Sequence, residues 1–113
     1  MRDNIERLKD IQEAITEIEK YSSQGETAFR ENELIQTWII YHLQVIGEAS
    51  RGLSDDFKST HSGINWRKVI DFRNVLIHQY FRIDLDLVWT IVEEQIPDLK
   101  QKINQIIDET ESS

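Results

Sequence analysis

Apolar residues recur at spacings of three and four along most of this chain, and this helical periodicity constrains its fold more than any other feature. The first such stripe, with charged residues between its members, consists of Ile5, Leu8, Ile11, Ile15 and Ile18. It predicts a helix over residues 4–21. No run of alternating apolar and polar residues is long enough to predict a strand. The expected fold is therefore all-α, an up-and-down bundle of four to five helices.

A second, longer helix is predicted over residues 27–53, and it carries two apolar faces. One face consists of Leu34, Trp38, Tyr41, Val45 and, at its end, Glu48. The other consists of Ile35, Ile39, Leu43 and Ile46. So wide an apolar surface suits a central helix that packs on more than one side. Gly52 lies at the predicted end, where a left-handed backbone would be accommodated.

A polar connection over residues 54–65 separates this helix from a third one. The third helix is predicted over residues 66–77, with Ser62 or Asn65 as its N-cap. Residues 79–83 depart from the helical pattern and predict a second, shorter connection.

Asp84 is expected to cap a fourth helix that begins at Leu85. Pro97 is expected either to kink this helix or to begin a fifth one, because proline is tolerated in a first helical turn but not in an interior. The last apolar stripe consists of Leu99, Ile103, Ile106 and Ile107. A polar tail is expected over residues 109–113.

The length of 113 residues suits a single domain, assigned here to residues 1–113, and 39% hydrophobic with 30% charged residues is typical of a soluble globular protein. Small helical domains of this kind often dimerise to hide their remaining apolar surface. No apolar run approaches the roughly 20 residues that span a bilayer, and the N-terminus shows no signal-peptide stretch. We expect a cytoplasmic protein without a membrane partner. The absence of cysteine excludes disulfides and thiolate chemistry.

The net charge of −8 argues against a nucleic-acid partner, but the charge is unevenly distributed. Residues 51–82 contain six basic and three acidic residues, a local charge of +3, whereas the remainder carries −11. Two of the three histidines, His61 and His78, lie in this basic segment. Acidic outer helices that keep the protein soluble are the simpler explanation of the total charge.

Within the basic segment, an arginine, a histidine and a tyrosine lie close together as Arg73, His78 and Tyr80. Arginine is always charged, and histidine titrates near neutrality. At about 100° per residue, Arg73 and His78 would point roughly 140° apart on a continuous helix. To act on one phosphate, they require either a helix that loosens near Ile77 or a second copy of the chain. From spacing alone, a structural role for these residues stays open.

The sequence Arg73-Asn74-x-x-x-His78 resembles the signature of HEPN domains, and the extension to Tyr80 is similar to the Arg-x4-His-x-Tyr form of HepT-like toxins. The segments 45–49, 64–69 and 83–89 also resemble that family, so that the match covers about the whole chain. Gln79 stands where relatives often carry an acidic residue.

The resemblance implies a homodimer that brings two copies of the motif into one cleft and cuts RNA without a metal or cofactor. His78 would serve as general base or acid, Arg73 would bind the phosphate, and Asn74 would hydrogen-bond the phosphate or orient His78. Tyr80 would contact RNA, and it would be the residue to which an MntA-like nucleotidyltransferase antitoxin transfers AMP. Glu48 is a candidate partner of Arg73, although a surface glutamate there would need no explanation.

Two alternatives remain beside the toxin hypothesis. One is a non-catalytic HEPN module that docks a nucleotidyltransferase or holds a nucleotide, which the acidic total charge favours slightly. The other, a metal-binding bundle, lacks ligands at metal-binding spacing.

The other histidines and the tryptophans are expected to be structural. His42 is predicted to be a helix-surface or satisfied core histidine, and His61 to be exposed to solvent. The tryptophans Trp38, Trp66 and Trp89 each fall on an apolar stripe, which indicates core packing or a dimer contact.

Overall fold

The computed structural model describes residues 3–74 and 84–112, and these residues are almost entirely helical. Five helices precede residue 75: α1 (Asn4–Ser22), α2 (Glu26–Glu31), α3 (Glu33–Arg51), α4 (Asp55–Thr60) and α5 (Trp66–Ile70). A 3-10 helix, η1 (Asp71–Asn74), follows α5 directly. The C-terminal part consists of α6 (Leu85–Thr90), the π-helical turn η2 (Ile91–Gln95) and α7 (Ile96–Ser112). The described residues contain no strand, so the predicted all-α class is confirmed.

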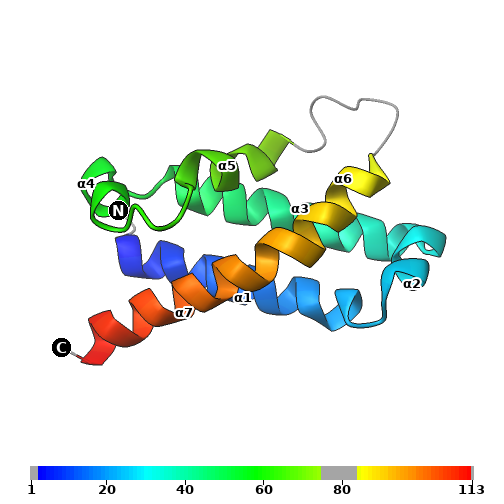
Figure 1. Ribbon diagram of the computed structural model, residues 1–113, viewed down its shortest axis with the longest axis horizontal. Coiled ribbons are helices and arrows are strands. Elements are labelled where there is room, and N and C mark those ends of the chain that lie inside the picture. Colours follow the sequence, from blue (N-terminus) through cyan, green and yellow to red (C-terminus); the bar gives the residue numbers. More distant parts are fainter. Residues whose placement is uncertain (1–2, 75–83, 113) are drawn as a thin grey trace.

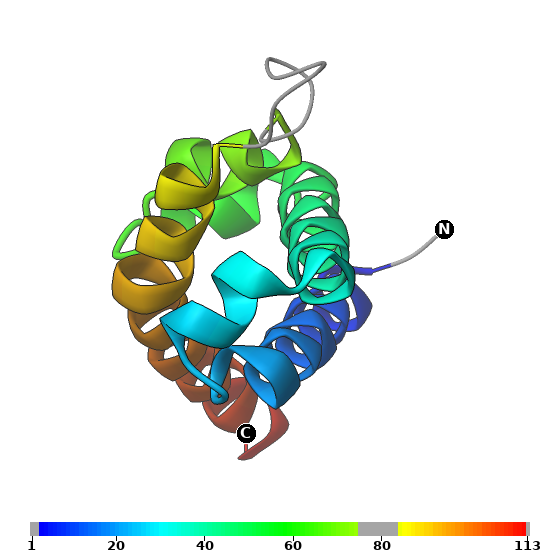
Figure 2. The ribbon, with the colours of Figure 1, turned by 90° about the vertical axis from the view of Figure 1, so that its right-hand side faces the viewer.

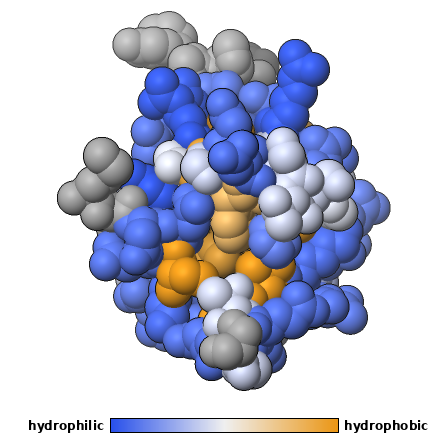
Figure 3. Space-filling model, turned by 90° about the vertical axis from the view of Figure 1, so that its left-hand side faces the viewer, coloured by the Kyte–Doolittle hydropathy of each residue, from blue (hydrophilic) through white to orange (hydrophobic). Residues whose placement is uncertain are grey.

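The long helices run side by side and enclose one apolar core (Figures 1 and 2). The helix α1 lies between α3 and α7, and α5 with η1 packs on the other side of α3. The short helix α2 lies across one end of the bundle, where its Phe29 is fully buried (Figure 2). At the opposite end, where α1 begins and α7 ends, apolar side chains are visible between polar ones (Figure 3). No described helix is long and apolar enough to cross a membrane.

The first and last predicted stripes form the core as expected. Leu8, Ile11, Ile15 and Ile18 of α1 are at most 1% exposed. The stripe on α7, which consists of Leu99, Ile103, Ile106 and Ile107, is buried as well. The prediction for residues 4–21 is confirmed within one residue, because Asp3 caps α1 by accepting a hydrogen bond from the Glu6 N–H at 2.9 Å. The predicted polar tail is wrong in one respect, since α7 continues through it to Ser112.

The predicted helix over residues 27–53 is wrong at one position, because the chain leaves helical geometry at Asn32. Its φ of −124° and ψ of 106° are extended values, and they separate α2 from α3. The Asn32 side chain accepts hydrogen bonds from the N–H groups of Leu34 and Ile35. A short polar side chain that satisfies the first free N–H groups of a helix is a strong start signal. The flanking Glu31 and Glu33 favour a helix, and they concealed this signal in the sequence.

The expectation for Gly52 is also wrong. Its φ of −78° is right-handed, so no left-handed turn requires a glycine there. A Cβ at this position would overlap the Arg7 guanidinium, but that group is the end of a flexible side chain and can move aside.

Residues 54–74 differ from the prediction in two ways. The predicted connection contains a helix, and the predicted third helix changes to a 3-10 helix. The connection 54–65 contains α4, which Ser54 caps. Asn65 is confirmed as the N-cap of α5, because it accepts a hydrogen bond from the Lys68 N–H at 3.2 Å. The α-helical geometry ends at Ile70 rather than continuing through the described part of the predicted range, and η1 takes its place.

At Pro97 the structure combines the two expected outcomes. Proline has no N–H to donate to the Glu93 carbonyl, and its ring would clash with that carbonyl in a regular α-helix. The turn before it widens into η2, in which the Ile96 N–H reaches back five residues to the Ile91 carbonyl. A new α-helix, α7, begins at Ile96 without a break in the chain direction. The predicted cap of the fourth helix is confirmed, since Asp84 accepts a hydrogen bond from the Leu87 N–H at 3.0 Å.

Candidate functional site

Arg73 lies on η1, which is held against the bundle by its neighbour Phe72. The Phe72 ring is 2% exposed and lies in the core, whereas the Arg73 side chain is 32% exposed. Asn74 at the end of η1 is half-buried. In a 3-10 helix, side chains three residues apart lie one above the other, so its tighter winding changes the direction in which Arg73 leaves the backbone. A loosening near Ile77 was one of two alternatives, and Ile77 lies outside the described residues; the helix type already changes at Asp71.

Gly47 of α3 permits the backbone of η1 to come this close. A Cβ at Gly47 would lie 2.6 Å from the Arg73 backbone nitrogen and 2.9 Å from the Ile70 carbonyl oxygen. Both neighbours are backbone atoms, so neither could move away without shifting η1 itself. Glycine in the interior of a helix costs about 1 kcal/mol relative to alanine. Here that cost is offset by a close contact that places Arg73 beside α3.

Glu48, the next residue on α3, pairs with Arg73. The Arg73 Nη1 lies 3.5 Å from the Glu48 Oε2, and the Arg51 Nη1 lies 3.4 Å from the Glu48 Oε1. The Glu48 side chain is 63% exposed, so this is a solvated pair of modest strength. Among the described residues, this pair orients the guanidinium through one nitrogen of a group that carries five N–H donors. The geometry matches the suggested partnership, and the role of the pair in catalysis stays a prediction.

A groove runs along α3 beside this pair. It has a volume of about 370 Å³, and it is lined by Tyr41, Gln44, Val45, Glu48 and Arg73. Tyr41 is 59% exposed, and it stands two helical turns from Glu48 on the same side of α3. The groove thus offers a cation at one end and an aromatic ring at the other. Sequence reasoning assigned no site role to Gly47, Gln44 or Tyr41. Gly47 could have been found as an isolated glycine within a helical pattern, which often marks a close packing contact.

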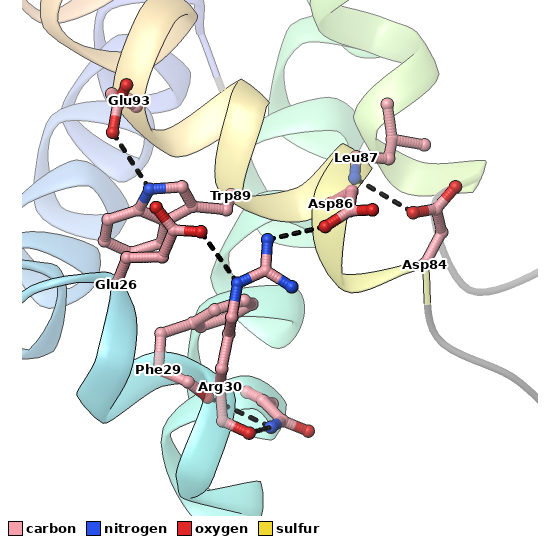
Figure 4. Close-up of polar contacts among 9 residues, drawn as sticks. Glu26, Phe29, Arg30, Asp84, Asp86, Leu87, Trp89 and Glu93 are labelled. Atoms are coloured by element: carbon pink, nitrogen blue, oxygen red, sulfur yellow. Dashed lines mark hydrogen bonds and ion pairs between the residues drawn. The ribbon is translucent and has the colours of Figure 1, made fainter.

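The beginning of α6, which follows the motif in the sequence, is held by polar and aromatic contacts (Figure 4). Arg30 of α2 pairs with Glu26 of its own helix at 2.7 Å and also with Asp86 of α6. Hydrogen bonds to Glu26 and then to Asp86 raise the pKa of Arg30 above its already high usual value. Next to it, Trp89 packs on Phe29 with ring centroids 5.3 Å apart. Together with the Asp84 cap, these contacts fix the beginning of α6.

His78 and Tyr80 lie outside the described residues, and so do the other positions from 75 to 83. The distance from Arg73 to either group is therefore not part of the site geometry. The elements on both sides of this segment are described, and they place Arg73 and Asn74 before it and Asp84 after it.

The other two histidines are engaged in structural contacts. His42 is 9% exposed, its Nδ1 lies 2.8 Å from the Trp38 carbonyl oxygen, and it is the satisfied core histidine that was one of the two expectations. The prediction that His61 is exposed is wrong, because it is half-buried and packs on the Phe57 ring at 4.5 Å. Among the described residues no group of three or more His, Asp or Glu side chains could hold a metal ion.

The tryptophans follow the expected pattern in part. Trp66 is 7% exposed in the core, and its Nε1–H donates to the His61 carbonyl. Trp89 is half-buried, and Trp38 is 37% exposed at the surface of α3, where its Nε1–H donates to the Glu17 carbonyl.

Comparison with known proteins gives a consistent result. A family model described as "Ribonuclease HepT-like" matches residues 11–106. "Probable ribonuclease HepT" of Thermococcus cleftensis is 38% identical over 108 residues, which cover 93% of this chain and 96% of the relative. "Putative RNase MJ1380" of Methanocaldococcus jannaschii is 35% identical over 97 residues, which cover 85% and 89% of the two chains. No solved structure matches this chain.

Proposed function

This chain belongs to the HepT-like ribonuclease family, and from that premise we propose that it is a metal-independent endoribonuclease that acts as the toxin of a type II toxin–antitoxin pair. The observation that carries the proposal is the placement of Arg73. Its guanidinium lies at one end of an open groove, oriented by Glu48 and supported by a backbone contact that only a glycine permits. That arrangement suits an exposed phosphate better than it suits a buried structural ion pair.

The proposed reaction needs one proton shuttle and one source of positive charge. The ribose 2′-hydroxyl attacks the adjacent phosphorus as His78 takes its proton, and the 5′-oxygen of the next nucleotide leaves after it receives a proton. The products are a cyclic phosphate and a free 5′-hydroxyl. Negative charge that develops on the phosphate oxygens is stabilised by the fork of Arg73. Asn74, on the same turn, hydrogen-bonds the phosphate or orients His78.

The antitoxin is proposed to neutralise the ribonuclease by modifying the same site. A nucleotidyltransferase antitoxin of the MntA type transfers AMP from ATP to the Tyr80 hydroxyl and releases pyrophosphate. Tyr80 lies seven residues from Arg73 in the sequence. The added phosphate places negative charge and bulk where the RNA phosphate would bind. The active form is proposed to be a homodimer, in which two copies of the motif share one cleft.

The test compares RNA cleavage by the wild type in EDTA with cleavage by Arg73→Ala and His78→Ala. We expect the first variant to lose about 10²–10³-fold and the second about 10²–10⁴-fold in rate, with unchanged far-UV helicity. Arg67→Ala is the matched control, because Arg67 is an exposed arginine of the same basic segment and lies outside the groove. Cleavage by the wild type should also disappear when the partner nucleotidyltransferase adds AMP, and Tyr80→Phe should resist this loss.

Two outcomes would contradict the proposal. Cleavage that persists in both motif variants would mean that another part of the chain is responsible. A folded, unmodified wild type that cuts none of several RNA classes would favour the non-catalytic module that docks a nucleotidyltransferase, with Arg73 in a docking role.

A further inference from the structure

The carboxylate of Glu48 contacts two arginines, one on each of its oxygens. The Arg51 Nη1 lies 3.4 Å from the Glu48 Oε1, and the Arg73 Nη1 lies 3.5 Å from the Glu48 Oε2. The two guanidiniums come from different elements, α3 and η1. They are no farther apart than one small anion can bridge. Among the described residues, no other acidic side chain pairs with either arginine.

The carboxylate is held loosely between the two arginines. Hydrogen bonds between a cationic nitrogen and an anionic oxygen are commonly about 2.7–2.9 Å long, and both contacts here are longer. The Glu48 side chain is 63% exposed, so it can turn toward solvent without leaving a buried, unpaired charge. Arg51 and Arg73 would then keep two positive charges, with five N–H donors each, around a position that another anion can enter.

Sharing this carboxylate distinguishes Arg51 from the other basic residues of the segment 51–82. The lining of the groove reaches as far as Glu48 and Arg73, and Arg51 lies one turn farther along α3, on the other oxygen of Glu48. Lys58 pairs with Asp55 instead, at 3.8 Å. Arg51 therefore extends the positive end of the groove.

We propose that Arg51 is a second phosphate-binding residue of this site. Arg51 and Arg73 hold the two non-bridging oxygens of one RNA phosphate at the position that the Glu48 carboxylate occupies in the free protein. The proposal rests on the proposed function and deepens it, because it adds a residue to the same site. A carboxylate and a phosphodiester each present two oxygens on one central atom, and arginine binds both in the same forked manner.

The charge of the reacting phosphate explains the use of two arginines. A phosphodiester carries one negative charge. A second develops when the 2′-oxygen, having given its proton to His78, bonds to phosphorus before the 5′-oxygen leaves. Arg73 matches the first charge, and Arg51 supplies a cation for the second. An interaction that strengthens in the transition state raises kcat more than it tightens substrate binding, so Arg51 is expected to act mainly on kcat.

The first test measures kcat and KM for RNA cleavage in EDTA. We expect Arg51→Ala to lower kcat by about 10²-fold and to raise KM by less than about tenfold. Its far-UV spectrum should be unchanged, because the Arg51 side chain is 61% exposed. Arg51→Lys keeps the charge but not the fork, so it should recover only part of the loss.

Lys20→Ala is the matched control for the loss of one exposed cation. Lys20 on α1 also pairs with a glutamate three residues earlier, Glu17, and its side chain is 56% exposed. It lies outside the groove lining. This variant should cleave RNA at the wild-type rate.

A double variant separates contact with RNA from an effect exerted through Glu48. If Arg51 only drew Glu48 away from Arg73, its removal would let Glu48 block Arg73. Glu48→Gln removes the negative charge, so it would then restore cleavage to the Arg51→Ala variant. We expect instead that Arg51→Ala with Glu48→Gln stays about 10²-fold slower than Glu48→Gln alone.

Sulfur substitution tests the contact with each phosphate oxygen. RNA in which sulfur replaces one non-bridging oxygen has two configurations at phosphorus, Rp and Sp, and each weakens the contact with one arginine. Both configurations should slow the wild type. Arg51→Ala should lose its sensitivity to one configuration and keep its sensitivity to the other.

Three outcomes would overturn the inference. These are an Arg51→Ala variant that cleaves like Lys20→Ala, a double variant that regains the rate of Glu48→Gln, and an Arg51→Ala variant that both sulfur configurations slow as they slow the wild type. Failure of the proposed function looks different, since the wild type would then not cleave RNA at all. In that case fluorescence anisotropy with a labelled RNA oligonucleotide decides. Weaker binding by Arg51→Ala than by Lys20→Ala would support the phosphate contact, whereas equal affinities, or no binding by the wild type, would overturn it.

Discussion

At the scale of single residues, the site depends as much on a missing side chain as on the charged ones. Because Gly47 has no side chain, η1 can lie directly on α3. A Cβ at this position would lie only 2.6 Å from the Arg73 backbone nitrogen. Arg73 therefore receives its position from the backbone of η1 rather than from a strong side-chain contact. Its ion pair with Glu48, at 3.5 Å and largely solvated, orients the guanidinium but holds it only weakly.

We expect Gly47→Ala to displace η1 and lower RNA cleavage at least tenfold. Overpacking costs about 1–3 kcal/mol, and the better helix propensity of alanine returns up to about 1 kcal/mol of this. The free energy of unfolding, measured by urea denaturation, should therefore fall only slightly while the cleavage rate falls sharply.

Gly63→Ala provides the control, because a Cβ at Gly63 would meet nothing within 4 Å. Equal cleavage rates for Gly47→Ala, Gly63→Ala and the wild type would show that the close contact does not position Arg73.

At the scale of elements, the segment that carries the motif is held at its two ends by different means. Before it, η1 is fixed by the buried Phe72 and by Gly47. After it, α6 begins at a side-chain cap from Asp84, and Asp86 in its first turn pairs with Arg30. The second attachment uses exposed polar groups, so it is the weaker of the two.

We expect Asp84→Ala to cost about 1 kcal/mol of stability, because it removes the cap of α6. The effect should be local, so hydrogen exchange at the backbone amides of Leu87 and Val88 should accelerate before that of α1. Asp84→Asn keeps an oxygen at the same place, and it should behave like the wild type. Protection that is unchanged in Asp84→Ala would mean that the Arg30 contact alone secures the start of α6.

The elements also show what a sequence can predict. The stripes on α1 and α7 specify buried faces directly, and the caps at Asn65 and Asp84 are local signals, so these elements were predicted correctly. The break at Asn32 was missed because its neighbours Glu31 and Glu33 are good helix formers, which gave no sign of an interruption. The change to a 3-10 helix at Asp71 depends on the approach of α3, which no local pattern records. Glu48 could be suggested as a partner of Arg73, but its distance could not.

At the scale of the whole molecule, the elongated bundle measures 45 × 26 × 24 Å and carries a net charge of −8. Acidic residues of α1 face one side of α3, and Arg73 faces the other. A chain of this charge offers little general attraction for a polyanion, so RNA would be held by a few contacts on one face.

A weak dependence of RNA affinity on salt follows from that charge distribution. Each phosphate contact on a single strand contributes a slope of about −0.7 in a plot of log affinity against log salt. With one Arg73 from each copy, we expect a slope of about −1.4, measured by fluorescence anisotropy with the inactive His78→Ala protein. A slope steeper than about −4 would require a broad basic surface that the described residues do not provide.

The carboxylate of Glu48, which lies between Arg51 and Arg73, gives the resting protein an anion of its own. An incoming anion must displace this carboxylate before it can use the whole guanidinium of Arg73. A solitary chloride or a loosely held metabolite gains too little to do so, whereas a polymer that is gripped at several points does. Under the proposed function, Glu48 would thereby favour RNA over small anions at Arg73.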